Sequence, residues 1–300
     1  MAAKTCSKRS LPTGLLLSAP ALLGLLLFVA VPFTLAFLLS FTNLRLGSPL
    51  PLEWVGLEQY RRIFSDPAFL RAIANNSLFA LVVVPLQTTA ALVLALLLNR
   101  ALGAVKLFRT LFFLPVVFPL SLVAIVWMLI LAPGPNGMMN AAMESLSLGA
   151  WESRDFLRDP DWALPAIMLT SIWQGVGFQM VILLAGLQAI PRELYESAAI
   201  DGAGRGRQFL HITLPQLRNT LIFVMLVTTM LAFRLFDQVQ IMTQGGPLRA
   251  TTTVMFEAVQ AAFTRQQVAK AAAMTVVLFG IVLIITWIQR RITREEREIA

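Results

Sequence analysis

The 300-residue chain has very little of the material from which catalytic and metal sites are usually built. It contains one cysteine, Cys6, and one histidine, His211. A single thiol excludes an intrachain disulfide and a cysteine-based metal cluster, because both need at least two. One imidazole leaves little material for a histidine metal site or a Ser-His-Asp triad. We therefore expect no metal, no cofactor and no bond chemistry in this chain, and a surface or packing position for His211.

Charge is also scarce. Only 13% of the residues are charged, whereas 57% are hydrophobic and the mean hydropathy is +0.75. A soluble domain carries about 25% charged residues. So much apolar surface does not fit inside one aqueous core, and the composition therefore indicates an integral membrane protein.

Six apolar runs are long enough to cross a bilayer, which takes about 20 helical residues. The first run follows Lys4, Lys8 and Arg9, but it is too long for a signal peptide and lacks a clear cleavage site, so we expect an uncleaved first span. The sequence predicts an all-α polytopic membrane protein whose residues 1–300 form one transmembrane domain. The expected spans lie near 14–40, 74–98, 110–132, 163–189, 219–242 and 271–289.

The positions of the charges give the orientation. With the N-terminus in the cytoplasm, the cytoplasmic segments carry fourteen cations and six acids, and the outer segments carry eight cations and nine acids. Cytoplasmic loops are enriched in Lys and Arg. Both termini are therefore predicted to be cytoplasmic, and the net charge of +8 reflects membrane topology and not nucleic-acid binding.

One charged segment, "ELYESAAIDGAGRGRQFLHITLP" at 193–215, interrupts the apolar runs on the cytoplasmic side. Pro191 suits a first helical turn and the acids Glu193 and Glu196 favour a helix N-terminus, whereas glycines suit a helix end. These signals predict a helix over 191–201, a bend, and a second helix before Pro215. The residues alone support a docking element and an ordinary amphipathic loop helix equally.

The spacing within that segment favours the docking element. Glu196-Ser197-Ala198 is followed after three residues by Gly202, and after nine more by Ile212-Thr213-Leu214-Pro215. This pattern resembles the EAA loop of ABC-type importer permeases, with Ser197 in place of the first alanine. "LSFTNLRL", "WVGLEQYRRIFSDPAF", "LFRTLFFLP" and "TQGGP" resemble the carbohydrate branch of that family, the maltose and glycerol-3-phosphate type.

The resemblance implies a type I ABC importer permease fold in a prokaryotic inner (plasma) membrane, importing a sugar or a related polyol such as glycerol-3-phosphate. It also implies three protein partners, namely a second permease in a heterodimer, a dimeric ATPase that holds ATP and Mg, and an extracytoplasmic substrate-binding protein. This chain has no Gly-x4-Gly-Lys-Ser/Thr pattern of its own. By resemblance, the loop contacts the ATPase through Glu193, Glu196, Ser197, Ala198, Ala199, Asp201, Gly202, Gly204, Ile212, Leu214 and Pro215.

Two helix faces are the expected substrate site. In the fourth span, and again in the fifth, four residues recur at i, i+3, i+4 and i+7. The resemblance to maltose-type permeases implies that they line a sugar site in the membrane, although helix packing through small residues explains each position equally well. The predicted lining is Ser171, Gln174, Gly175, Phe178, Thr228, Leu231, Ala232 and Leu235, with Asp237 added.

The charges beside the fifth span have two interpretations. Arg234 and Asp237 are three residues apart, which favours a local ion pair over a substrate contact or a gate. Gln238 and Gln240 extend a polar outer vestibule.

Three other functions remain open. An intramembrane enzyme would need a catalytic pair within the spans, and the sequence offers no such arrangement. A secondary carrier would need no coupling segment and would work without an ATPase. An ABC permease for a non-sugar solute is opposed only by the resemblance to the carbohydrate branch.

Overall fold

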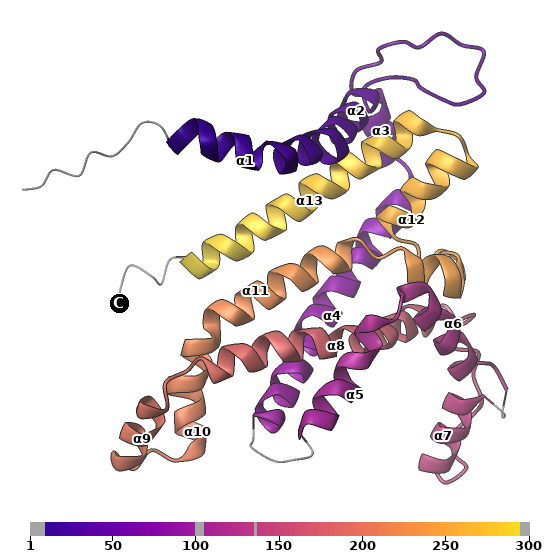
Figure 1. The fold of residues 1–300 in the computed structure, drawn as a ribbon. Helices are drawn as coiled ribbons and strands as arrows, with labels where there is room; N and C mark the ends of the chain where they lie inside the picture. Colours follow the sequence, from indigo (N-terminus) through magenta and orange to yellow (C-terminus); the bar gives the residue numbers. More distant parts are fainter. Residues whose placement is uncertain (1–9, 100–104, 135–136, 295–300) are drawn as a thin grey trace, which may run out of the picture. The chain divides into compact units, whose positions relative to one another are not determined.

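The computed structural model describes residues 10–99, 105–134 and 137–294 of the chain (Figure 1). Lys4, Cys6, Lys8, Arg9 and Arg100 lie outside these ranges, as does the acidic and basic C-terminal tail. Within them the protein is helical and has no β-strand, with one isolated β-bridge between Thr42 and Trp54. The all-α prediction is confirmed.

Five helical stretches of the described residues are long and apolar enough to cross a membrane. The first combines α1 (Ser10–Leu25), η1 (Leu26–Ala30) and α2 (Val31–Leu39), and the fourth combines α10 (Arg205–Gln208), η2 (Phe209–Thr213) and α11 (Leu214–Phe233). The other three are α4 (Pro67–Leu98), α8 (Ala163–Gln188) and α13 (Val268–Arg294). The shorter elements are α3 (Glu58–Phe64), α7 (Met138–Leu146), α9 (Arg192–Ile200), η3 (Val239–Thr243), α12 (Val254–Val259) and η4 (Gln260–Thr264).

The predicted span near 110–132 is two helices and not one. α5 (Val105–Val117) and α6 (Leu120–Ile130) meet at an angle of 102°. Pro119 stands between them with φ −56° and ψ 140°, outside the helical region. A proline has no N–H to bond the carbonyl four residues back, and it disfavours helix in the residue before it, so the helix breaks here.

The fifth predicted span is shifted toward the N-terminus. The helix does not end before Pro215 but runs continuously from Arg205 to Phe233. It accommodates the proline through the wider π-helical turn η2, in which the N–H of Leu214 bonds the carbonyl of Phe209, five residues back. The helix then ends at Phe233, well before residue 242.

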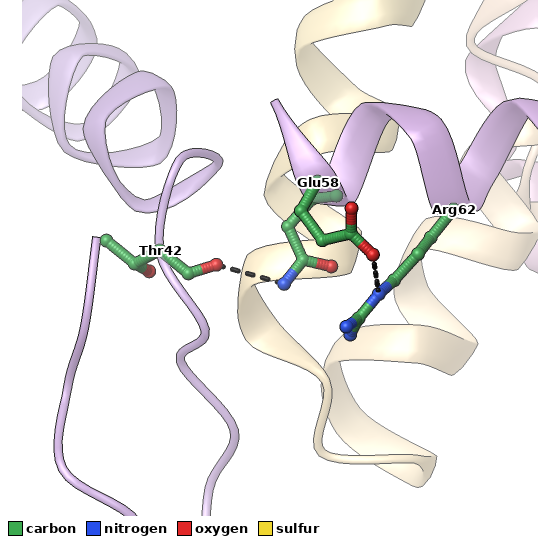
Figure 2. Close-up of polar contacts among 4 residues, drawn as sticks. Thr42, Glu58 and Arg62 are labelled. Carbon is green, nitrogen blue, oxygen red and sulfur yellow. Dashed lines mark hydrogen bonds and ion pairs between the residues drawn. The ribbon is translucent and has the colours of Figure 1, made fainter. Parts of the chain in front are cut away.

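The described residues form two compact units. The residues up to Ile63 and Ala258–Val276 make the first, and Phe64–Glu257 with the residues from Val277 make the second. In the first unit, the buried Gln59 donates to the carbonyl of Thr42 at 2.9 Å, and Glu58 pairs with Arg62 at 3.0 Å (Figure 2). The pair is exposed, so it adds at most about 0.5 kcal/mol, and the buried hydrogen bond is the stronger anchor of α3.

Helix α8 is the centre of the second unit, where α4, α5 and α11 pack against it. Glycines allow two of these approaches. A Cβ at Gly177 would overlap the backbone carbonyl of Phe112 in α5, and a Cβ at Gly186 would lie 2.9 Å from side-chain atoms of Leu217 and Thr220 in α11. Close packing through small residues is the usual way in which helices associate in lipid. Because α4, α5 and α11 all pack against α8, the polar side chains of α8 lie among residues of these helices.

Candidate functional site

Two adjoining cavities lie in the second unit, between α4, α8 and α11 and the turn that follows α11. Their volumes are about 260 Å³ and about 140 Å³. They share five lining residues, namely Gln87, Gln174, Gly175, Thr228 and Leu231. The smaller cavity extends along α11 toward Val224, and the larger extends toward Gln238. The described residues contain no group of three His, Cys, Asp or Glu side chains that could hold a metal ion.

The structure brings all of the predicted lining residues to these two cavities. The helical period accounts for this result on α8 and α11, because residues at i, i+3, i+4 and i+7 share one face, whereas Leu235 and Asp237 lie beyond the end of α11. Their binding role stays a prediction. Ser171, Gln174, Gly175 and Phe178 come from α8, Thr228, Leu231 and Ala232 come from α11, and Leu235 and Asp237 come from the turn.

Two lining glutamines were missed from the sequence. Gln87 comes from α4, and its amide lies against Gly175, where an added Cβ would overlap it. The sequence could have indicated Gln87, because it is the only glutamine in the apolar run 74–98. Gln179 stands five residues after Gln174, which places it off the face that the i, i+3, i+4 rule selects.

Buried amide groups in the cavity walls have unused hydrogen-bonding capacity. Gln179 is 3% exposed and donates through Nε2 to Thr228 Oγ1 at 2.5 Å, while its Oε1 has no partner within the described chain. Gln238 is 2% exposed and accepts through Oε1 from Ser171 Oγ at 2.5 Å, while its Nε2 has no such partner. Leaving a buried polar atom unsatisfied costs about 1–3 kcal/mol. The walls therefore contain one buried acceptor and one buried donor whose hydrogen-bonding capacity is unused.

The predicted local ion pair between Arg234 and Asp237 is wrong. Among the described residues no ion pair joins Arg234 to Asp237, and both residues instead border the larger cavity. An i, i+3 pair needs a continuous helix, whereas α11 ends at Phe233 and Arg234 already has φ −90° and ψ 11°. The broken helix leaves the two charged side chains facing the same cavity without pairing.

The turn that carries these charges is fixed by residues far away in the sequence. Asn76 of α4 is 0% exposed; its Nδ2 donates to the carbonyl of Ala232 at 3.2 Å, and its Oδ1 accepts from the N–H of Val254 at 2.8 Å. Thr253 Oγ1 donates to the carbonyl of Leu235 at 2.8 Å. The backbone is therefore held on both sides of Arg234.

We predict that Asn76→Ala lowers the free energy of unfolding by about 1–3 kcal/mol, because it leaves the buried N–H of Val254 without an acceptor, whereas the carbonyl of Ala232 still accepts from the N–H of Leu235 at 3.4 Å. Asn43 makes the same two kinds of bond, to Pro51 and Glu53, in an exposed setting. Water replaces those bonds, so Asn43→Ala is the matched control. Thermal unfolding in detergent measures the stability of both variants. An equal loss of stability in the two would contradict a stabilising role for the buried hydrogen bonds of Asn76.

The coupling segment folds as the sequence predicts, within one residue at each end of its first helix. α9 runs from Arg192 to Ile200 and ends in a turn in which Gly202 has φ +76°. The N–H of Ala203 bonds the carbonyl of Ala198 at 2.8 Å, and that of Gly202 bonds Ala199 at 3.1 Å. This is a Schellman motif, which needs a left-handed residue and therefore glycine. The first helix and the bend are confirmed, whereas the second helix continues past Pro215 to Phe233.

The predicted coupling residues are largely on the surface. Ile200 is 87% exposed and leaves a large apolar side chain on the surface of α9. His211 is exposed as predicted, with Nδ1 3.0 Å from the carbonyl of Arg207. The exposed members are Glu193, Glu196, Ser197, Ala199, Asp201, Gly202, Gly204 and Pro215, whereas Ala198, Ile212 and Leu214 are half-buried.

One contact ties α9 to the start of the next long helix. Tyr195 OH lies 3.0 Å from Oγ1 of Thr213, which is buried. Tyr195 and Ile212 also pack against the apolar cluster that contains Leu187 of α8 and Leu217 of α11. These contacts connect α9 to α8 and α11, the two helices that contribute most of the predicted lining residues.

Comparisons with known proteins agree with this geometry. Residues 87–298 match a family model described as "Binding-protein-dependent transport system inner membrane component". The sulfoquinovosyl glycerol transport system permease protein SmoG of Agrobacterium fabrum is 35% identical over 93% of this chain and 89% of its own length. The sn-glycerol-3-phosphate permease UgpA of Pectobacterium atrosepticum is 31% identical, over 91% and 90%.

Two further relatives extend the comparison. The diacetylchitobiose uptake permease NgcF of Streptomyces coelicolor is 32% identical over 86% of this chain and 75% of its own length. A bacterial ABC transporter involved in the import of the acidic polysaccharide alginate has a chain of the same fold, with a TM-score of 0.82 and 22% identity over 96% of this chain and 98% of that one.

Proposed function

Because the chain belongs to the family of binding-protein-dependent transport system inner membrane components, we propose that it imports a sugar or related polyol by alternating access, driven through α9 by a separate ATPase. It is a multi-pass membrane protein and a permease subunit of a sugar ABC importer. The observation that carries the proposal is the pair of cavities, lined by a few polar side chains, between helices that are in direct contact with the exposed helix α9. This single arrangement supplies both a place for a hydroxylated solute and a means of moving the walls around it.

The cavity walls suit a polyhydroxylated ligand. Amides of Gln87, Gln174 and Gln238 and the hydroxyls of Ser171 and Thr228 provide donors and acceptors, and Phe178 provides an aromatic surface. Sugars present both hydroxyls and apolar C–H faces. A small number of polar groups within a largely apolar pocket is typical of small-molecule sites.

The coupling helix suits a groove on another protein. Glu196, Ser197 and Ala198 match the family pattern, small side chains allow close approach, and Ile200 offers an exposed apolar contact. ATP binding would draw the coupling helices of two permeases together, and α9 would move α8 and α11 through Tyr195. The partner ATPase would hold ATP and Mg, and hydrolysis would reset the cycle.

The remaining partners follow from the family. We propose a heterodimer with a second permease and delivery of solute by an extracytoplasmic binding protein; one similar solved transporter is bound to a periplasmic protein. The proposed orientation places both termini and α9 in the cytoplasm. The relatives named above are permeases for sulfoquinovosyl glycerol, diacetylchitobiose and sn-glycerol-3-phosphate, so we place the substrate in the class of sugars and polyols.

The test is uptake by proteoliposomes that contain the chain, its companion permease and its ATPase. A panel of labelled sugars and polyols is offered with the binding protein, with and without enclosed ATP. We expect uptake of one compound class that requires ATP. Uptake driven by a proton or sodium gradient in the absence of ATP would contradict the importer and favour a secondary carrier.

We predict that Gly175→Ala lowers uptake at least about 10-fold with little loss of stability. The added Cβ would overlap the amide of Gln87, which belongs to a side chain that can swing away, so the fold tolerates it. The displaced amide would fill the region that the two cavities share. Gly280→Ala in α13 is the control, because a Cβ there meets nothing within 4 Å. The expected 10-fold loss of uptake corresponds to about 1.4 kcal/mol. A normal uptake rate for Gly175→Ala would contradict the proposal that the cavities are the substrate site.

A further inference from the structure

Arg234 is a charged side chain that borders the larger cavity without an ion pair in the described chain. It is exposed, and Asp237 lies on the same cavity without bonding it. Ionisable residues at membrane-spanning depth are costly, and they usually face a partner, a water-filled space or a transported group. We propose that Arg234 binds an acid group of the substrate, so that the imported solute is an anionic carbohydrate or polyol bearing a carboxylate, phosphate or sulfonate.

The backbone on both sides of Arg234 is held in place by hydrogen bonds from side chains elsewhere in the chain. The carbonyl two residues before it, that of Ala232, is held by Asn76, and the carbonyl one residue after it, that of Leu235, is held by Thr253. Four residues further on, the side chain of Gln238 is held by Ser171. A guanidinium on a fixed backbone loses less freedom when it binds, which is the condition for selective recognition.

The neighbouring groups define the rest of the ligand. The unpartnered Nε2 of Gln238 is a second donor, buried within the same wall. A guanidinium with its five N–H groups matches the oxygens of an acid group in a bidentate manner. The carboxylate of Asp237 accepts hydrogen bonds only, so it suits hydroxyls and repels an acid group. A ligand that satisfies both must carry hydroxyls at one end and an acid group at the other.

This inference rests on the proposed importer function and narrows it to one substrate class. A neutral sugar would offer Arg234 no counter-charge of its own when the cavity closes, and a charge that loses water without binding an opposite charge costs several kcal/mol. An acid group removes that cost, and selectivity against the neutral analogue follows from the same charge. Arg234 would thus determine specificity without taking part in energy coupling.

The experiment compares matched compounds in the reconstituted, ATP-driven complex. Methyl glucoside is paired with its analogues that carry a carboxylate, phosphate or sulfonate at carbon 6, and glycerol with sn-glycerol 3-phosphate. KM and kcat of uptake are measured for the wild type, Arg234→Gln, Arg234→Lys and Arg158→Gln. Arg158 is the control, because its side chain is 88% exposed and lies near Asp155, away from the cavities.

We expect the wild type to take up the acid-bearing members and to discriminate against the neutral ones. Arg234→Gln should raise KM for the acid-bearing members about 10- to 100-fold with kcat nearly unchanged, since hydrogen bonds to charged groups are worth that factor. Arg234→Lys should retain most of the preference, and Arg158→Gln all of it.

Two results would overturn the proposal. One is ATP-dependent uptake of a neutral member with a KM equal to or below that of its charged partner. The other is an equal rise of KM for neutral and charged members in Arg234→Gln, which would show a structural role. Both leave ATP-driven import standing, whereas loss of the ATP requirement in the wild type is the separate failure of the importer function.

Discussion

Gly202→Trp should lower the rate of ATP-driven uptake about 100-fold or more, while the helices of the protein remain folded. Gly202 has φ +76°, and a Cβ built there meets no atom of its own chain within 4 Å. The left-handed backbone costs a larger residue about 1–2 kcal/mol, too little to unfold the chain. The indole would instead occupy the space beside α9 at which we propose that the ATPase docks. A loss of ~3 kcal/mol at a docking contact accounts for a 100-fold effect.

Two controls separate docking from strain. Gly202→Ala carries the same backbone strain without bulk and should keep most of the uptake. Gly56→Trp carries both, because Gly56 has φ +58° with open space around its Cβ, but it lies in the predicted outer loop. Circular dichroism and gel filtration confirm folding. Normal uptake by Gly202→Trp, or an equal loss in Gly56→Trp, would argue against a coupling role for this turn.

Gly177→Ala should cause the largest loss of stability of any single methyl group added to α8. The new Cβ would overlap the backbone carbonyl of Phe112, and a backbone inside a helix cannot swing away as a side chain can. α5 and α8 would have to separate, which places the cost at about 3 kcal/mol, the upper end for overpacking a well-packed contact.

Gly186→Ala provides the comparison for Gly177→Ala, because its Cβ would approach only side-chain atoms of Leu217 and Thr220. We expect a smaller shift in the apparent melting temperature in detergent for Gly186→Ala, and a markedly reduced yield of monodisperse protein for Gly177→Ala. Equal melting temperatures for the two variants would mean that the α5–α8 contact is looser than the structure indicates.

Features set by local signals could be predicted from the sequence. Pro191 and Gly202 define the ends of α9 through backbone chemistry that needs no tertiary contact, and the prediction was accurate to one residue at each end. The helical period placed Ser171, Gln174 and Phe178 on one face, and that face borders the cavities.

Features set by contacts between distant segments could not be predicted. The end of α11 at Phe233 depends on Asn76 holding the carbonyl of Ala232, a bond across 156 positions of sequence. The predicted ion pair between Arg234 and Asp237 was wrong for the same reason, because it needed the helix to continue past Phe233. Gln179 was missed because its partner, Thr228, lies on another helix, which no periodicity within α8 reveals.

The most direct test of the central claim is to purify the tagged chain in mild detergent after co-expression with the neighbouring genes of its host, and to identify what accompanies it. The account predicts that an ATPase subunit co-purifies in stoichiometric amount with the wild type and with Gly56→Trp, and is lost from folded Gly202→Trp. A wild-type chain that purifies without any ATPase, or a Gly202→Trp variant that retains it fully, would contradict coupling through α9.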